Sequence, residues 1–344
     1  MTFVVTRFDF RAPGAGPEER RDRYRAALDL ARYAEESGHD AVNLSEHHGS
    51  EDGYLPSPLI ASSAIAAVTS RIPISVWAVI APLYDPVRLA EDMSVLDHLS
   101  SGRVSYTFGL GYRPAEYALH SRAWRGRGAR LEAQLETMIA TWRGEPVGEG
   151  PVDGSPRLTA TPRPFSRPHP LVFLGGGAAA ARRAGRLGMH YQPQLDDPML
   201  RTLYREECAA NGHEPGLVVV PIPGPATVFC AADPDAFWGR HGHHLLADAR
   251  GYRAWQDDPP PASDQPVADR PATRSSFVHS DARTVDELRA EGVYLVATPD
   301  DLVRRVRDGE LGLIATHPLC GGLPIKAGWE SMRLLGEKVL PRIR

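Results

Sequence analysis

Short apolar runs alternate with amphipathic helical patterns along most of the chain. This alternation predicts βα units and a parallel sheet. The runs predict eight strands, at residues 3–8, 40–44, 72–80, 104–110, 171–174, 190–194, 217–229 and 313–316. Four helix starts pair a capping residue with a proline, namely Ser57-Pro58, Asp85-Pro86, Asp233-Pro234 and Thr298-Pro299. Because eight parallel strands close a (β/α)8 TIM barrel, we predict that α/β fold, with insertion loops.

Two segments interrupt this rhythm. Residues 145–170 are rich in glycine and proline and predict an excursion from the barrel. Residues 256–282 are rich in proline and aspartate, which predicts a mobile loop. Insertions of this kind often form lids over the site, and a solvated linker without a role is the alternative. No repeat or linker divides the chain, so we expect one domain over residues 1–344.

Charge and cysteine content narrow the class of partner. The net charge of −4 gives no basis for binding nucleic acid or a membrane surface. Three cysteines far apart in the chain fit a reducing compartment better than a disulfide framework. The first residues lack the apolar core of a signal peptide, and no run approaches the roughly 20 apolar residues of a membrane span. We therefore expect a soluble, cytoplasmic protein.

A cluster of polar and ionisable side chains ends the second predicted strand, where residues 43–48 read Asn-Leu-Ser-Glu-His-His. Burying two imidazoles and a carboxylate is costly without a purpose. In strand–helix proteins, ligands bind at the carboxyl ends of the strands. The sequence therefore predicts an active site around His47.

A longer series of segments resembles one family. The series SEHH, PLYDPVRLAED, LDHLSSGR, GLGYRPAEY and THPLCGGLPIKAGWESMRLLGEKVLP is similar in order and spacing to the bacterial luciferase-like flavin-dependent monooxygenases. The similarity runs from residue 3 to the last helix. It implies a barrel that binds reduced FMN at its C-terminal face. In that family a separate reductase supplies the reduced FMN, which reacts with O₂ to give a flavin peroxide that oxidises a small organic substrate.

Carried over by position, His47 matches the family's catalytic histidine. A neutral imidazole there could act as a base or proton donor, since its reference pKa is about 6.5. The alternative is a hydrogen-bonded histidine that shapes the pocket. Glu46 would either orient His47 or contact the ligand, and we expect His48 to be structural.

The resemblance also implies where the flavin ring would lie. Family members often hold a non-prolyl cis peptide beneath this ring, and Trp77-Ala78 matches that position. A tryptophan in the barrel core is the alternative interpretation of Trp77. Glycines at 109 and 111 would let a flat ligand approach the backbone. Leu110 stands where luciferases place an arginine.

A phosphate site is predicted where Gly175, Gly176 and Gly177 lead into a helix that begins near Ala178. The exposed N–H groups of a helix start suit a phosphate, and Arg182 follows about one turn later. Many relatives place serine or threonine hydroxyls in this turn, whereas this chain has alanines. A glycine-rich turn without a ligand is the alternative.

Other candidates are less specific. His317, after the last predicted strand, would touch flavin or substrate, or cap its own loop. Four aromatic residues are candidate pocket walls, although core packing explains each equally well: Phe8, Tyr54, Phe108 and Tyr112. His241 and His244 share a helical face, but no cysteine or carboxylate cluster completes a ligand set, so we expect no metal site.

The leading hypothesis is thus a two-component monooxygenase that uses reduced FMN and O₂ on an unidentified small molecule. Some relatives instead use a deazaflavin cofactor and transfer hydride without O₂, which is the first alternative. A flavin-binding protein that has lost catalysis is the second. Family members commonly form dimers through early helices. The apolar face of Ala61, Ile65, Ala66 and Val68 is the contact that we predict for a homodimer, and packing into the chain's own core is the alternative.

Overall fold

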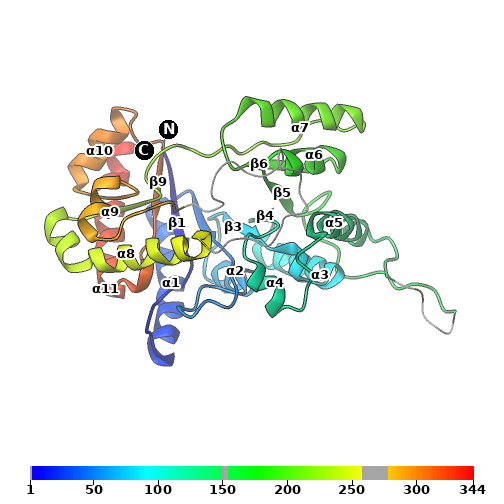
Figure 1. The fold of residues 1–344 in the computed structure, drawn as a ribbon, viewed down its shortest axis with the longest axis horizontal. Helices are drawn as coiled ribbons and strands as arrows, with labels where there is room; N and C mark the ends of the chain where they lie inside the picture. Colours follow the sequence, from blue (N-terminus) through cyan, green and yellow to red (C-terminus); the bar gives the residue numbers. More distant parts are fainter. Residues whose placement is uncertain (1, 149, 151–153, 258–277) are drawn as a thin grey trace.

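In the computed structural model, residues 2–148, 150, 154–257 and 278–344 are described. Seven of their strands form one parallel sheet in the order β6-β5-β4-β3-β2-β1-β9. The sheet curls inside a layer of helices (Figure 1). The remaining strands, β7 and β8, pair in parallel, and β7 lies beside β9. The strands are β1 Phe3–Phe8, β2 Ala41–Leu44, β3 Ile74–Val79, β4 Val104–Phe108, β5 Leu171–Gly176, β6 His190–Pro193, β7 Thr227–Cys230, β8 Tyr294–Ala297 and β9 Leu313–Thr316.

Helices follow the strands as the βα pattern predicts. α6 and α7 lie beside β5 and β6, whereas α8 to α11 gather beside β1 and β9 (Figure 1). The α-helices are α1 Pro17–Ser37, α2 Pro58–Val68, α3 Pro86–Ser100, α4 Pro114–Leu119, α5 Arg127–Arg143, α6 Ala178–Arg186, α7 Pro198–Ala210, α8 Pro234–Asp257, α9 Val285–Glu291, α10 Pro299–Arg307, α11 Ile325–Leu334 and α12 Leu340–Ile343. The predicted α/β barrel fold is confirmed.

The strand predictions fail at two places. The predicted strand 217–229 forms only as β7 at its end, while Val218 makes a single bridge to Tyr191. The apolar residues before β7 are interrupted by prolines, which cannot donate to a sheet. β8, only four residues long, was not predicted. Its length falls at the lower limit of what a periodic pattern can reveal.

Three of the four predicted caps form. The side chains of Asp85, Asp233 and Thr298 each accept a hydrogen bond from a backbone N–H in the first turn of their helix. The side chain of Ser57 makes no such bond. The caps fix where these helices start and therefore how each strand end is presented.

The predicted dimer contact is wrong. Ala61, Ile65 and Ala66 point into the chain's own core, and Val68 is partly buried. The α2 and α3 side chains that do face outward include Ile60, Val95 and Leu99, which are 73%, 45% and 60% exposed. An amphipathic helix buries an apolar face against its own sheet. The sequence pattern of that face is the same whether it packs inside the chain or against a second copy, so the pattern could not distinguish the two.

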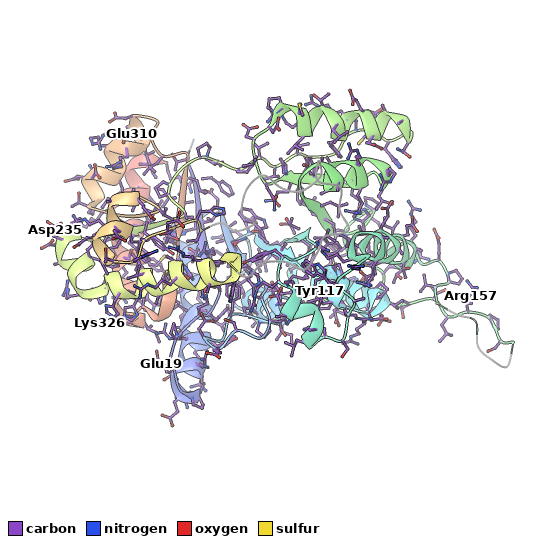
Figure 2. All side chains as sticks on the ribbon, viewed as in Figure 1. Glu19, Tyr117, Arg157, Asp235, Glu310 and Lys326 are labelled. Carbon is purple, nitrogen blue, oxygen red and sulfur yellow. The ribbon has the colours of Figure 1, made fainter. Side chains whose placement is uncertain are left out.

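The later part of the excursion after α5 packs away from the barrel mouth that carries His47. It leads to the start of β5, and its backbone binds the end of α3: His98 Nε2 lies 2.9 Å from Arg163 O, and Ser166 N donates to Asp97 Oδ2 at 2.6 Å. These contacts lie at the amino ends of the strands. Arg157 stands far out on the same excursion (Figure 2).

The predicted mobile loop, 256–282, falls mostly outside the described residues. Its first two residues end α8, and residues 278–282 are packed, with Val278 and Ala282 buried. Cys208, Cys230 and Cys320 are free and buried. Within the described chain, every helix is too short or too polar to cross a membrane.

Candidate active site

The carboxyl ends of β3, β4 and β5 form a floor of small and partly exposed residues. The Trp77-Ala78 peptide bond is cis, as the resemblance implied, and both residues are partly exposed. A Cβ added to Gly109 would lie 3.2 Å from Ala78 Cβ, and one added to Gly175 would lie 2.8 Å from Thr107 Cγ2. Larger side chains at these glycines would therefore disturb the floor.

His47 stands beside this floor, at the end of β2, and is buried. Its Nδ1 lies 2.8 Å from Glu116 Oε1, and its Nε2 lies 3.2 Å from the Tyr112 hydroxyl. Three aromatic rings surround the imidazole, with centroids 4.8 Å away for Tyr54, 5.2 Å for Tyr112 and 4.6 Å for Trp255. The imidazole is therefore held in one orientation with both nitrogens engaged.

Glu116, on α4, determines which nitrogen of His47 carries a proton. Burial favours the protonated acid, but the hydrogen bond from His47, the hydrogen bond from the His48 N–H and the charge of Arg113 together hold the pKa of Glu116 below its usual value. An ionised carboxylate only accepts, so Nδ1 of His47 donates to it. In the neutral imidazole, Nε2 is then the basic nitrogen.

Of the two roles predicted for Glu46, orienting His47 is wrong, and contact with the ligand stays a prediction. Glu46 Oε1 accepts hydrogen bonds from His48 Nε2 at 2.6 Å and the Tyr84 hydroxyl at 2.7 Å, and Oε2 accepts from Ile80 N at 2.9 Å. Glu46 thus joins the ends of β2 and β3. His48 is structural, as expected. Neighbouring residues on an extended backbone point in opposite directions, so Glu46 and His47 do not face each other.

The C-terminal end of α8 packs against His47. The Tyr252 hydroxyl lies 3.0 Å from the Tyr54 hydroxyl, and the Arg113 guanidinium lies 4.2 Å from the centroid of the Trp255 ring. α8 is the yellow helix that crosses in front of the sheet in Figure 1. Tyr54 and Tyr112, two of the predicted pocket walls, therefore lie against His47 together with two aromatic residues that the sequence did not indicate.

Two predicted pocket walls are wrong. Phe8 and Phe108 have no exposed surface and belong to the apolar core. The alternative interpretation of these residues, core packing, is correct. Phe8 ends β1 and Phe108 ends β4, and other core residues cover both side chains. Leu110 is partly exposed at the mouth, and its carbonyl accepts a hydrogen bond from the Tyr117 hydroxyl.

The turn from β5 into α6 has the features of a phosphate site. Gly177 is the N-cap and no side chain caps the helix, so its first N–H groups are available to a ligand. A Cβ added to Gly177 would meet no atom within 4 Å, and Ala178 is partly exposed. Arg182 is partly buried on the same helix. An open helix start beside a flat glycine floor fits a flavin phosphate and its ring.

His317 does not lie on an open rim. It is buried, with Nε2 3.1 Å from Asp9 Oδ1 and Nδ1 3.3 Å from Arg7 Nη2. Asp248, His317 and Cys320 place potential ligand atoms within 4.8 Å of one another. Arg7 and Arg11 occupy the same region, each within 4.0 Å of Asp248. Two guanidinium groups disfavour a cation, so we assign this cluster to packing of α8 rather than to metal binding.

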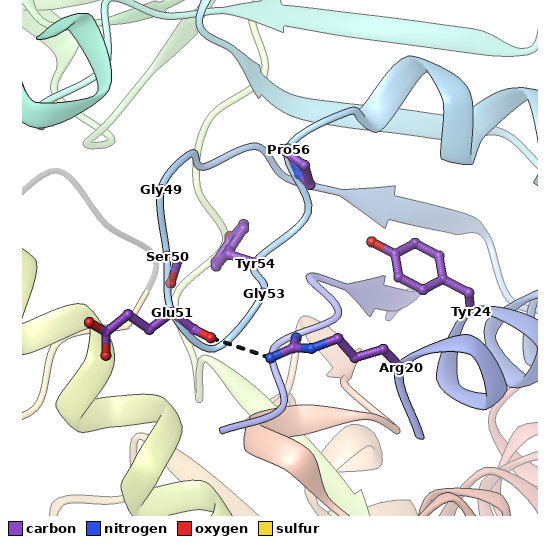
Figure 3. Close-up of a pocket in the computed structure, with 8 residues that line it drawn as sticks. All are labelled: Arg20, Tyr24, Gly49, Ser50, Glu51, Gly53, Tyr54 and Pro56. Carbon is purple, nitrogen blue, oxygen red and sulfur yellow. Dashed lines mark hydrogen bonds between the residues drawn. The ribbon is translucent and has the colours of Figure 1, made fainter. Parts of the chain in front are cut away.

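A cavity of about 440 Å³ lies on the outer side of the loop that follows β2 (Figure 3). Arg20 spans it and donates to the backbone oxygens of Glu51 and Asp52 at 3.3 and 2.8 Å. Tyr54 forms the wall between this cavity and His47. Arg20 thus braces the loop that carries an active-site aromatic.

Sequence reasoning missed Glu116, Tyr252 and Trp255. Glu116 carried a weak signal, because it follows the same strand as the floor glycine Gly109. Tyr252 and Trp255 carried none, since they reach the site from a helix that follows β7.

The comparisons with known proteins agree with this geometry. The sequence model of the luciferase-like monooxygenases matches residues 1–316, so the chain belongs to that family. The oxygenase component of a flavin-dependent trigonelline monooxygenase from Acinetobacter baylyi is 25% identical over 154 residues, which are 44% of this chain and 42% of that protein. The matched segment thus spans less than half of that relative.

Three solved structures share the fold over nearly their whole length. Monooxygenase RslO1 from Streptomyces bottropensis superposes with a TM-score of 0.71 at 26% identity, with 100% of both chains covered. The oxygenating constituent of 3,6-diketocamphane monooxygenase from Pseudomonas putida, in complex with FMN, gives 0.66 at 20%, covering 100% and 99%. An F420-dependent secondary alcohol dehydrogenase gives 0.64 at 15%, also covering 100% and 99%. The last two show the fold alone.

Proposed function

We propose that this chain is the oxygenase component of a two-component monooxygenase, which takes reduced FMN from a separate reductase and uses O₂ to oxidise a small organic substrate. The observation that carries the proposal is His47, held between Glu116 and Tyr112 beside a glycine floor at the barrel mouth. Membership of the luciferase-like family and the flavin-dependent relative support it.

The residues divide the work as follows. Gly109 and Gly175 let a flat ring lie against the backbone, and the start of α6 holds the phosphate. Trp255 and Tyr54 keep water from His47, which takes up or releases a proton at Nε2. When bound, reduced FMN supplies the electrons that activate O₂ for transfer of one oxygen atom to the substrate.

The test is an anaerobic titration of the protein with reduced FMN, followed by mixing with oxygenated buffer in a stopped-flow spectrometer. Saturable binding, with a reaction with O₂ that differs from that of free reduced FMN, is the expected result. Binding of a reduced deazaflavin in its place, without O₂ uptake, would favour hydride transfer, to which the F420-dependent neighbour points. Binding of neither cofactor would refute a flavin-type function.

We also propose a homodimer, formed by the exposed apolar residues of α2 and α3 rather than by the inward face predicted from sequence. Ile60, Val95 and Leu99 are large apolar side chains left in water on neighbouring helices. Contact with a second copy of the chain would remove this apolar surface from water.

A further inference from the structure

Tyr112 stands between His47 and the barrel mouth. It is partly exposed, whereas His47 is buried. With Nδ1 bound to Glu116, the only nitrogen of His47 left for chemistry is Nε2, and the Tyr112 hydroxyl already lies 3.2 Å from it. A reactant that exchanges a proton with His47 therefore meets the Tyr112 oxygen first.

No other described hydroxyl competes for that nitrogen. Tyr54 also packs its ring against His47, but its hydroxyl is shared with Ser45 at 2.5 Å and Tyr252 at 3.0 Å. Trp255 offers only an N–H donor and no acceptor. The edge-on contact of Tyr54 and the tilted contact of Trp255 close the sides of the imidazole without offering a route for a proton.

The surroundings also fix the direction of the hydrogen bond. Burial, with Tyr54 and Glu116 nearby, raises the pKa of Tyr112 far above its usual value, against the opposite influence of Arg113 and Arg11. Tyr112 therefore keeps its proton and donates it to Nε2. Its oxygen has a lone pair free to accept a second hydrogen bond from the mouth.

We propose that Tyr112 is a catalytic residue, and that its hydroxyl rather than the His47 imidazole exchanges the proton with the reactants. The inference rests on the proposed function. In one direction, a reactant O–H or N–H gives its proton to the Tyr112 oxygen while the Tyr112 proton moves to Nε2. The product is an imidazolium paired with the Glu116 carboxylate, and the reverse step returns a proton to the reactant. Glu116 is a positioning residue that also stabilises this imidazolium.

The first arm of the test uses the full chain without cofactor and isotope-labelled histidine, with His47 assigned by His47→Gln. The expected NMR spectrum shows a neutral imidazole with the proton on Nδ1. Tyr112→Phe should shift the Nε2 signal, while the control Tyr106→Phe, which removes a buried hydroxyl without a partner from β4, should not. If Tyr112→Phe leaves the Nε2 signal unchanged, the proposed transfer of a proton through Tyr112, here called the relay, is refuted.

The second arm loads the same proteins with reduced FMN and measures hydrogen peroxide release after mixing with O₂. Loss of one general acid–base group slows proton transfer by roughly a hundredfold or more. Tyr112→Phe, His47→Gln and the double variant should therefore slow release to a similar extent, because residues that act as a unit are not additive. Losses that multiply in the double variant, or a Tyr112→Phe rate equal to wild type, would overturn the relay. Failure of the wild type to bind reduced FMN would instead refute the proposed function, and the histidine spectrum would still decide the relay.

Discussion

Arg11 fastens the end of α8 to the active-site loop. It is almost fully buried, its Nε donates to Asp52 Oδ2 at 2.7 Å, and its Nη1 donates to the backbone oxygen and Oδ1 of Asp248 at 3.1 and 3.2 Å. Its guanidinium carbon lies 4.9 Å from the ring centroids of both Tyr252 and Trp255. We therefore predict that Arg11→Ala both destabilises the fold and loosens the aromatic cover over His47.

The magnitude follows from what the substitution leaves behind. Asp248 is buried and would lose its main cation, and removing one partner of a buried ion pair costs about 3–5 kcal/mol. The Tyr294 hydroxyl, 2.6 Å from Asp248 Oδ2, and Arg7, 4.0 Å away, remain as partners. Asp52 is partly exposed and can bind water instead. We expect the lower end of this range, about 3 kcal/mol.

Urea unfolding of the cofactor-free chain measures this loss. The control is Arg21→Ala, because Arg21 pairs with Asp22 at 2.8 Å but both side chains are about half exposed, so its loss should destabilise the fold far less than the loss of Arg11. Adding Asp248→Asn to Arg11→Ala removes the uncompensated charge and should recover part of the stability. Equal costs for the two arginine variants, or no recovery in the double variant, would refute the reasoning.

Three further predictions concern pH, cofactor binding and assembly. Burial lowers the pKa of His39 to about 4, so between about pH 6.5 and pH 4 the unfolded chain takes up a proton that the folded chain does not. The free energy of unfolding should therefore fall by about 3 kcal/mol as the pH drops through this range. In urea titrations His39→Gln should flatten that pH dependence. Gly177→Asp places a carboxylate at the start of α6 in open space, where it would repel a bound phosphate. It should weaken the binding of reduced FMN at least tenfold, by about 1.4 kcal/mol, and leave the binding of reduced riboflavin, which lacks the phosphate, unchanged. An equal loss of affinity for both ligands would refute the phosphate site. Ile60→Asp with Leu99→Lys should convert a dimer into a monomer in sedimentation experiments, and an unchanged mass would refute the proposed contact.

The barrel, and the end of it that carries the chemistry, could be predicted from local pattern. Strand and helix periods, capped helix starts and glycines at strand ends are properties of neighbouring residues. In a parallel sheet they bring every carboxyl end to one side, so the pattern alone brings His47, Gly109 and Gly175 to the same mouth. The pattern failed where an element was short or interrupted, as at β8 and in the prolines before β7.

The choice of partners within the site was decided by tertiary structure. Glu46, next to His47 in the chain, turns away to bind His48, while Glu116 reaches His47 from α4. Trp255 arrives from the far end of α8, where Arg11 and Asp248 fasten the helix. Such contacts depend on how helices pack over the strand ends, which no local period encodes. The sequence by itself therefore determined where the proposed acid–base residue, His47, lies, and only the packed fold decided which groups bind its two ring nitrogens.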